Sequence, residues 1–375
     1  MGLVRRMAAA LAAGALCCTT GCAGFWVYPG SSSGSSTSTS SSVNYVYVAN
    51  ATAATLSGFA VGTGTLTAVT GSPYALPFYP TAVAVNPANS IVFVAGNSEI
   101  YSYTINSGGS LSLLNTNPLV VADVVAMDIS PDGQWLLALD GNRVTVDEFQ
   151  ITSSSGVLTQ GAGASYSTTV TGFLPMAIKV ALLPNGSEYV FVALGTAGDL
   201  VYPFNTSTGV LSTPLPLSLG AGSVNSDDAL AVNANTSTLY IARTNSSSAG
   251  SIVAYSIGGG GALNQVAQGT TGVQPYSVVL NTAGTDVYVA NRTDGTISEF
   301  STTANSSQLP ALGTITSGTA VTALTVDSSG DYLLAANSGA NDLTMFSFDS
   351  MTPGTLDYLN EFATGTEPDV IAATH

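Results

Sequence analysis

The chain has 375 residues, of which 45% are hydrophobic and only 7% are charged, with 40 glycines. Long helices usually carry Glu, Lys, Arg and Gln on their solvated face, so this composition favours an all-β fold with almost no helix. Six basic residues stand against 22 acidic ones, for a net charge of −16. Such a chain lacks the basic surface that nucleic acids and anionic headgroups require, so we expect neither as a partner and attribute the acidity to solubility.

Residues 1–21 have the features of an export signal. A basic start containing Arg5 and Arg6 precedes an apolar stretch, residues 7–16, that is too short to span a bilayer. The only cysteines are Cys17, Cys18 and Cys22, at the end of this leader. The rest of the chain therefore has neither a disulfide nor a thiol nucleophile.

Thr19-Thr20-Gly21-Cys22 resembles a bacterial lipoprotein signal, although the pattern usually has Leu where Thr19 stands. The resemblance implies lipidation at Cys22; cleavage by the general signal peptidase near the same place is the alternative. Residues 22–43 are rich in Ser, Thr and Gly, which is typical of a flexible tether. We expect an exported protein of the periplasm or cell surface that touches the membrane only through this lipid anchor.

One short sequence recurs seven times beyond the tether. Tyr45–Asn50 reads YVYVAN, and its copies end at residues 50, 96, 140, 194, 243, 291 and 337. Intervals of 44 to 54 residues indicate repeated small sheets, because one such unit cannot bury its own apolar face.

The second unit shows the strands of one repeat. Residues 81–85, 91–95, 99–105 and 110–114 are β-prone runs separated by turn residues. Four short antiparallel strands make one propeller blade, so the sequence predicts a seven-bladed β-propeller over residues 44–375. Aromatic residues near the ends of the third strands are expected to pack between blades.

The order of the strands predicts how the ring closes. The chain enters the repeat at a second strand, residues 45–49, and leaves it at a first strand, residues 369–373. If these two strands pair, the ends of the chain share one blade and no edge stays open. A linear solenoid is the alternative, and it would leave both part-blades uncapped.

These copies, with turns such as Pro131-Asp132-Gly133 before them, resemble the Tyr-Val-Thr-Asn repeat class of propellers. Gly-Thr-Leu-Thr at 64–67 and Gly-Ser-Leu-Ser at 109–112 resemble its lactonase branch. That resemblance implies hydrolysis of a sugar-acid lactone such as phosphogluconolactone, with catalytic His, Glu and Arg at the channel mouth. The chain departs from this pattern because its only histidine is the terminal His375, which we expect to be frayed and solvent-exposed.

The few basic residues beyond the leader all map to one side of the predicted ring. Arg143, Arg243 and Arg292 lie at or just after the ends of second strands, and Lys179 lies on a first strand beside the channel. Arginine binds carboxylates and phosphates through bidentate contacts, so these residues suggest a cationic pocket for a small anionic ligand. The alternative is local pairing of Arg243 with Asp227 or Asp228, of Arg292 with Asp294, and of Arg143 with Asp140.

The loops leading into the first strands add polar residues to the same mouth. The ligand-binding candidates are therefore Lys179, Asp228, Arg243, Tyr276, Arg292 and Asp369. Because no histidine is suitably placed, a carboxylate would have to act as the general base. Asp228 and Glu367 are the candidates.

Two functions fit these observations. The first is a lactonase acting on a small anionic sugar-acid lactone, and the second is a non-catalytic scaffold that binds a ligand or a surface protein. We expect no cofactor and no metal site, since a structural zinc site needs clustered Cys and His. A monomer is expected.

Overall fold

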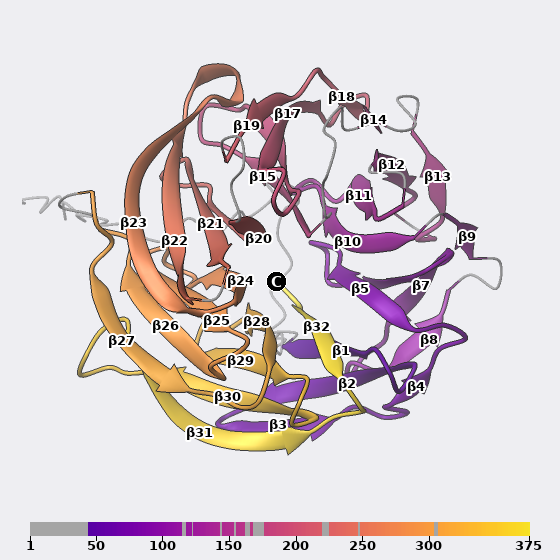
Figure 1. Cartoon of the computed structure of the whole chain (residues 1–375). Helices are drawn as coiled ribbons and strands as arrows, with labels where there is room; N and C mark the ends of the chain where they lie inside the picture. The colour runs from indigo at the N-terminus through magenta and orange to yellow at the C-terminus, as the bar shows by residue number, and fades with distance from the viewer. Residues whose placement is uncertain are drawn as a thin grey trace, which may run out of the picture. The chain divides into compact units, whose positions relative to one another are not determined.

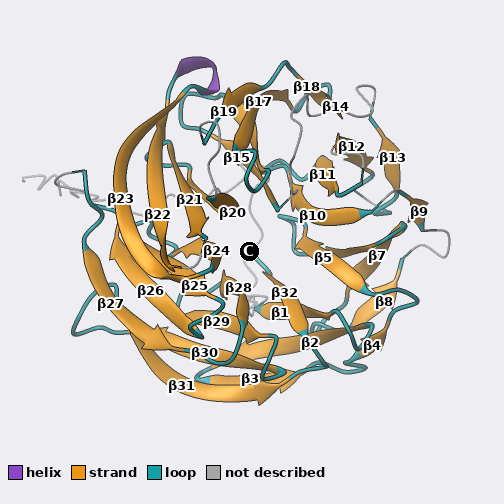
Figure 2. Cartoon of the chain, viewed as in Figure 1, coloured by secondary structure: helices purple, strands orange, loops and turns teal. Residues whose placement is uncertain are grey.

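The computed structural model describes residues 44–375 apart from 115–117, 122, 143–144, 154, 162–165, 168–175, 220–224, 247 and 304–306. The leader, Cys22 and the tether thus lie outside the described residues. Almost every described element is a strand, and the one helical turn is a 3-10 segment, η1 (Gly259–Gly261) (Figure 2). No helix in the described part is long and apolar enough to cross a membrane.

The strands form seven antiparallel sheets arranged in a ring, which confirms the seven-bladed propeller (Figure 1). The first strands are β32 (Pro368–Ala373), β5 (Pro80–Val85), β10 (Val124–Ile129), β15 (Ala177–Leu182), β20 (Ser226–Asn233), β24 (Pro275–Leu280) and β28 (Val321–Val326). The second strands are β1 (Tyr45–Asn50), β6 (Ile91–Gly96), β11 (Trp135–Asp140), β16 (Glu188–Ala193), β21 (Thr238–Asn245), β25 (Asp286–Asn291) and β29 (Tyr332–Asn337). In the order of these lists we number the blades 1 to 7.

The outer half of each blade follows the same order. The third strands of blades 1 to 7 are β2 (Thr55–Gly62), β7 (Glu99–Ile105), β12 (Thr145–Ile151), β17 (Asp199–Asn205), β22 (Ser248–Ile257), β26 (Thr296–Ser301) and β30 (Asp342–Phe348). The fourth strands are β3 (Thr65–Ala68), β8 (Leu111–Leu113), β13 (Leu158–Gln160), β18 (Val210–Leu211), β23 (Leu263–Val273), β27 (Ala311–Thr316) and β31 (Leu356–Ala363). Four short strands add to third strands in blades 1 to 4: β4 (Tyr74–Ala75), β9 (Leu119–Val120), β14 (Tyr166–Ser167) and β19 (Leu215–Leu217).

The recurring apolar run is explained by its place in the blade. Each second strand lies inside its sheet, and both of its faces meet a neighbouring blade. In β25, Val287 and Val289 pack toward blade 5 while Tyr288 and Ala290 pack toward blade 7. Because side chains alternate along a strand, a strand covered on both faces must be apolar at every position. Burying each such side chain contributes about 1.5–3 kcal/mol.

The hydrophobic core is divided into seven clusters, each joining two adjacent blades. Aromatic residues of third strands belong to them as expected: Phe149 packs against blade 2, and Phe300 packs with blade 5. First strands of adjacent blades touch all the way around, which makes them the innermost strands.

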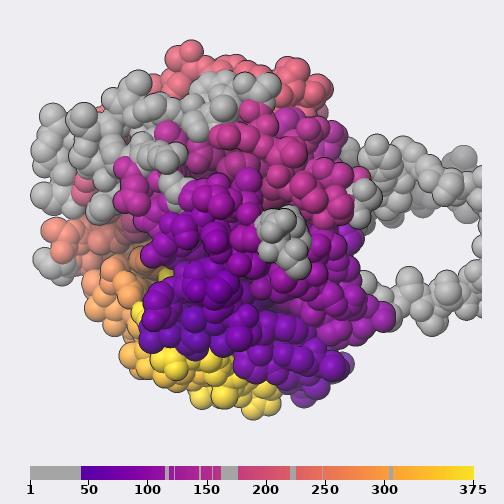
Figure 3. Space-filling model, turned by 90° about the vertical axis from the view of Figure 1, so that its right-hand side faces the viewer, coloured from indigo at the N-terminus to yellow at the C-terminus, as the bar shows by residue number. Residues whose placement is uncertain are grey.

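Blade 1 closes the ring as predicted. β32 pairs antiparallel with β1, with Val48 opposite Ile371, so the two ends of the described chain share one sheet. C-terminal residues lie directly against N-terminal ones on the outer surface (Figure 3). The chain ends near the centre of the ring, on the face that carries the turns between first and second strands (Figure 1).

Candidate functional site

A β-bulge occurs where six of the seven first strands begin, at the mouth of the central channel. In each case one extra residue separates two paired positions of the first strand. The extra residues are Asp369, Thr81, Val125, Asp228, Tyr276 and Thr322, in blades 1, 2, 3, 5, 6 and 7. Bulges re-aim side chains and often lie next to active sites. Three of the predicted site residues, Asp228, Tyr276 and Asp369, are thus placed equivalently around one mouth.

Arg292 joins this set from the end of β25. Its guanidinium carbon lies 5.0 Å from the centroid of the Tyr276 ring, a cation–π contact. Its backbone N–H donates to the Gln274 carbonyl at 2.9 Å, which fixes the chain next to β24. The alternative of an ion pair between Arg292 and Asp294 is not found among the described residues. The Asp294 carboxylate instead accepts the Val273 N–H at 2.7 Å.

The two bulge carboxyls have raised pKa values. Burial raises the pKa of Asp369, Arg292 lowers it and Glu367 raises it, and the net direction is upward. Burial also raises the pKa of Asp228, although hydroxyl hydrogen bonds from Ser226 and Thr244 oppose the shift. Both shifts are upward, which is the direction expected for a carboxyl that acts as a general base.

Tyr276 lies in the electrostatic field of its charged neighbours. Burial raises the pKa of its phenol, Asp369 and Asp228 raise it further, and Arg292 lowers it, with a net increase. The phenol therefore keeps its proton at neutral pH and can donate a hydrogen bond. Asp228, Tyr276, Arg292 and Asp369 together form what we call the mouth cluster.

Arg243 does not belong to the mouth cluster, because it is occupied by a buried partner. Its Nε and Nη2 donate to the two carboxylate oxygens of Asp227 at 2.6 and 3.0 Å, and Asp227 is fully buried. The local-pair alternative is therefore what the structure shows for Arg243, whose guanidinium is not part of an open cationic pocket in this arrangement. Burial, then Asp227, raises the pKa of the adjacent Asp199, and Arg243 lowers it, with a net increase.

Lys179 is likewise paired, deeper in the ring. Its Nζ lies 3.7 Å from Oδ1 of Asp128, and Oδ2 of Asp128 accepts the Val180 N–H at 2.7 Å. Sequence reasoning missed Asp128, although a carboxylate on the first strand of the preceding blade was a readable signal. Arg143 lies outside the described residues. Among the described basic residues, only Arg292 has no carboxylate oxygen within 4.0 Å.

Glu367 and His375 do not belong to the mouth cluster. Glu367 is exposed and its carboxylate accepts the Thr52 hydroxyl. His375 is not frayed as expected: its backbone N–H donates to Asn89 at 2.7 Å and its Nε2 lies 3.1 Å from the Val85 carbonyl oxygen. These contacts hold it at the opposite end of the first strands from the mouth cluster. No set of three or more His, Cys, Asp or Glu within the described ranges is arranged to hold a metal ion.

Comparison with known families gives one match. Residues 274–372 match the model of a family described as lactonase, seven-bladed β-propeller. That range contains Tyr276, Arg292 and Asp369 but not Asp228. No curated protein is significantly similar to the chain in sequence.

Solved structures share the fold at low sequence identity. A Bacteroides fragilis protein provisionally described as a 6-phosphogluconolactonase is 17% identical, with 90% of this chain and 99% of that chain covered and a TM-score of 0.73. The Pseudomonas aeruginosa periplasmic gluconolactonase PpgL is 17% identical, with 88% and 99% covered and a TM-score of 0.69. Kuenenia stuttgartiensis hydrazine synthase is 12% identical, with 80% and 91% covered and a TM-score of 0.61. One ring thus supports unrelated chemistries, and only the site can distinguish them.

Proposed function

We propose that this propeller is an exported lactonase that hydrolyses a small sugar-acid lactone carrying at most one negative charge. The observation that carries the proposal is the mouth cluster, in which the Arg292 guanidinium interacts with Tyr276 and Asp369 and the Asp228 carboxyl acts on the same phenol. The partial match to the lactonase family and the shared fold support the same reaction class.

Each member of the mouth cluster has a role in this reaction. Asp369 takes a proton from a water molecule, whose oxygen attacks the lactone carbonyl carbon. Arg292 stabilises the negative charge that develops on the carbonyl oxygen, as oxyanion donors do. The ring C–O bond then breaks and Asp369 returns its proton to the leaving oxygen. The carboxylic acid that forms releases its remaining proton to solvent, which leaves a carboxylate beside Arg292. We assign the base to Asp369 because both carboxylate oxygens of Asp228 already accept hydroxyl hydrogen bonds.

The charge balance of the mouth limits the substrate. Arg243 and Lys179, the other two described cations, are paired with Asp227 and Asp128. Arg292 is the one described cation that acts on Tyr276, and the two carboxyls Asp369 and Asp228 act on the same phenol, so a doubly charged phosphate would meet net negative charge. A neutral or singly charged lactone fits this balance better than the phosphogluconolactone that the family resemblance implies.

The test is a steady-state assay of gluconolactone and 6-phosphogluconolactone, corrected for spontaneous hydrolysis. We expect turnover of the neutral lactone with at least tenfold higher kcat/KM. Asp369→Asn should lower kcat/KM by about 10²–10⁴-fold, because it removes the base. Thr67→Ala, on the exposed outer strand β3, is the matched control and should leave the rate unchanged.

The alternative is a non-catalytic binding propeller, favoured by the lack of a histidine at the mouth. Absence of turnover above background, together with a thermal shift on adding a sugar acid that Arg292→Gln removes, would establish this alternative and reject the lactonase.

A further inference from the structure

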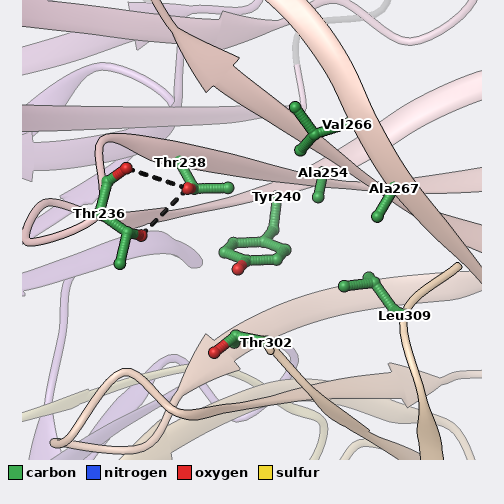
Figure 4. Close-up of a pocket in the computed structure, with 8 residues that line it drawn as sticks. All are labelled: Thr236, Thr238, Tyr240, Ala254, Val266, Ala267, Thr302 and Leu309. Atoms are coloured by element: carbon green, nitrogen blue, oxygen red, sulfur yellow. Dashed lines mark hydrogen bonds between the residues drawn. The ribbon is translucent and has the colours of Figure 1, made fainter. Parts of the chain in front are cut away.

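A small pocket lies between blades 5 and 6, on the opposite side of the ring from the mouth cluster. Its volume is about 100 Å³. The lining residues are Thr236, Thr238, Tyr240, Ala254, Val266, Ala267, Thr302 and Leu309 (Figure 4). Thr302 and Leu309 come from blade 6 and the others from blade 5, so the pocket opens between two sheets.

In other blades a Gly-x-Leu triplet at the start of the fourth strand fills this position. The six copies are Gly64-Thr65-Leu66, Gly109-Ser110-Leu111, Gly156-Val157-Leu158, Gly209-Val210-Leu211, Gly261-Ala262-Leu263 and Gly354-Thr355-Leu356. Every glycine of the set has a positive φ, between 59° and 91°. Five of them pack on the preceding blade; a Cβ on Gly209, for example, would lie 2.2 Å from the Trp135 ring.

Blade 6 departs from this pattern because Ser307-Gln308-Leu309 stands where the triplet is expected. Its segment instead pairs with the edge of blade 5: the Gln268 N–H donates to the Ser307 carbonyl at 3.0 Å, and the Leu309 N–H donates to the Gln268 carbonyl at 2.8 Å. These bonds attach residues 307–309 to β23.

Blade 5 contributes a second departure at the first residue of β21. Thr238 occupies the position that holds Tyr45, Ile91, Trp135, Tyr189, Asp286 and Tyr332 in the other blades. In five of these blades the residue is aromatic or isoleucine and in one it is Asp286, whereas blade 5 has the smaller threonine at the place where the triplet glycine is also missing. The two departures together leave the pocket open.

Tyr240 also differs from the tyrosines at the same position in other blades. Its counterparts Tyr47 and Tyr288 donate their hydroxyl hydrogens to the carbonyls of Gly109 and Gly354 in the next blade, at 2.8 and 3.0 Å. Tyr240 has the Thr302 side chain beside it instead, and both residues line the pocket. Its ring and hydroxyl line the pocket between Thr238 and Thr302 (Figure 4).

The lining determines which ligand fits. Four hydroxyls line the pocket, those of Thr236, Thr238, Tyr240 and Thr302, and no charged group is among the lining residues. The threonine hydroxyls already donate to protein oxygens, so they face a ligand as acceptors. Val266 and Leu309 add apolar contact. A cavity of 150 Å³ holds a benzene ring, so about 100 Å³ admits one edge of a six-membered ring. We propose that this interblade pocket binds a neutral sugar ring by its edge, with hydroxyls on the threonines and C–H groups against Val266 and Leu309.

The test replaces Thr238 with the tyrosine that other blades carry at this position. Thr238→Tyr should fold, because Tyr45 and Tyr332 occupy the same position in blades 1 and 7, and it should fill the pocket. Saturation-transfer NMR with glucose, mannose and galactose on the full chain should show binding with a Kd in the millimolar range. We expect Thr238→Tyr to weaken it at least tenfold and Thr67→Tyr, a matched change on exposed β3, to leave it unchanged.

Two results would overturn the proposal. One is the lack of saturation transfer from any of the three sugars at 50 mM, with water alone in the pocket of a sugar-soaked crystal. The other is sugar binding that Thr238→Tyr does not weaken. Gluconolactone turnover by Thr238→Tyr should stay at the wild-type rate, which separates this pocket from the mouth cluster.

Discussion

Two buried glutamates carry the same interaction in different blades. Glu148 of β12 accepts the Leu211 N–H of blade 4 at 3.1 Å, and Glu299 of β26 accepts the Leu356 N–H of blade 7 at 3.0 Å. Both are almost fully buried, at 0% and 3% exposure. Burial raises the pKa of each from 4.5 to about 7.

This shift makes stability depend on pH. The folded carboxyl of Glu299 binds its proton more tightly than the unfolded one, so its contribution is complete below pH 4.5 and is lost as the pH rises through about 7. We expect Glu299→Gln, which keeps the acceptor for Leu356 but cannot ionise, to raise the free energy of unfolding at pH 8 by about 1–3 kcal/mol. Urea denaturation at pH 4.5 and pH 8 measures it. The exposed Glu361→Gln is the control, and the same pH dependence in both variants would contradict this assignment.

A second residue-level prediction concerns the proposed base. Arg292 lowers the pKa of Asp369, so its removal should raise that pKa further. The acid limb of the kcat/KM profile should therefore move to higher pH in Arg292→Gln. Thr293→Ala, at an exposed neighbouring residue, is the control. An unmoved acid limb would mean that Asp369 is not the titrating base.

At the scale of the element, the asparagine that ends the recurring second strand links three segments. Nδ2 of Asn337 donates to Asp342 at 2.7 Å and to Thr344 at 2.8 Å on β30, and its Oδ1 accepts the Ser317 hydroxyl of the preceding blade at 2.9 Å. Asn50 makes the same kind of bonds to Thr55, Ser57 and Gly365. The asparagine of the repeat is therefore explained by structure rather than by chemistry.

We expect Asn337→Ala to lower the free energy of unfolding by about 1–3 kcal/mol, because it leaves buried hydroxyl and carboxylate groups without a partner. Chemical denaturation measures the change. Asn360→Ala on the exposed face of β31 should change it by less than about 0.5 kcal/mol. Equal effects of the two substitutions would refute the linking role.

At the scale of the whole ring, β32 covers the inner edge of β1. Without it, blade 1 would expose unpaired backbone groups, and the clusters on both of its faces would lose Ile371 and Val370. Deleting residues 368–375 should therefore give aggregated or unfolded protein by size-exclusion chromatography and circular dichroism. Deleting His375 alone should leave a folded ring. A folded monomer from the longer deletion would show that closure is not required.

Much of the ring could be predicted because the strands of each blade are specified by a local sequence pattern. The run Tyr45–Asn50 repeats as a chemical pattern, and its phase relative to residues 369–373 already implied closure. The charged site was less predictable. Arg243 ends its copy of the repeat and Arg292 directly follows the equivalent residue, Asn291, yet one is bound to buried Asp227 and the other stacks on Tyr276. The sequence offered both outcomes for each.

The sequence by itself determined the blade, the number of blades and the strand that closes them, because alternation and period are properties of consecutive residues. The tertiary structure alone decided which cation is uncommitted, which carboxyls are tuned and where a pocket remains. The pocket and the Lys179–Asp128 pair depend on side chains from adjacent blades, whereas Arg243 and Arg292 are distinguished within their own blades, by partners 16 residues away in the chain. The exposure and charge at such contacts are set by tertiary packing. The sequence pattern of a single repeat does not specify that packing.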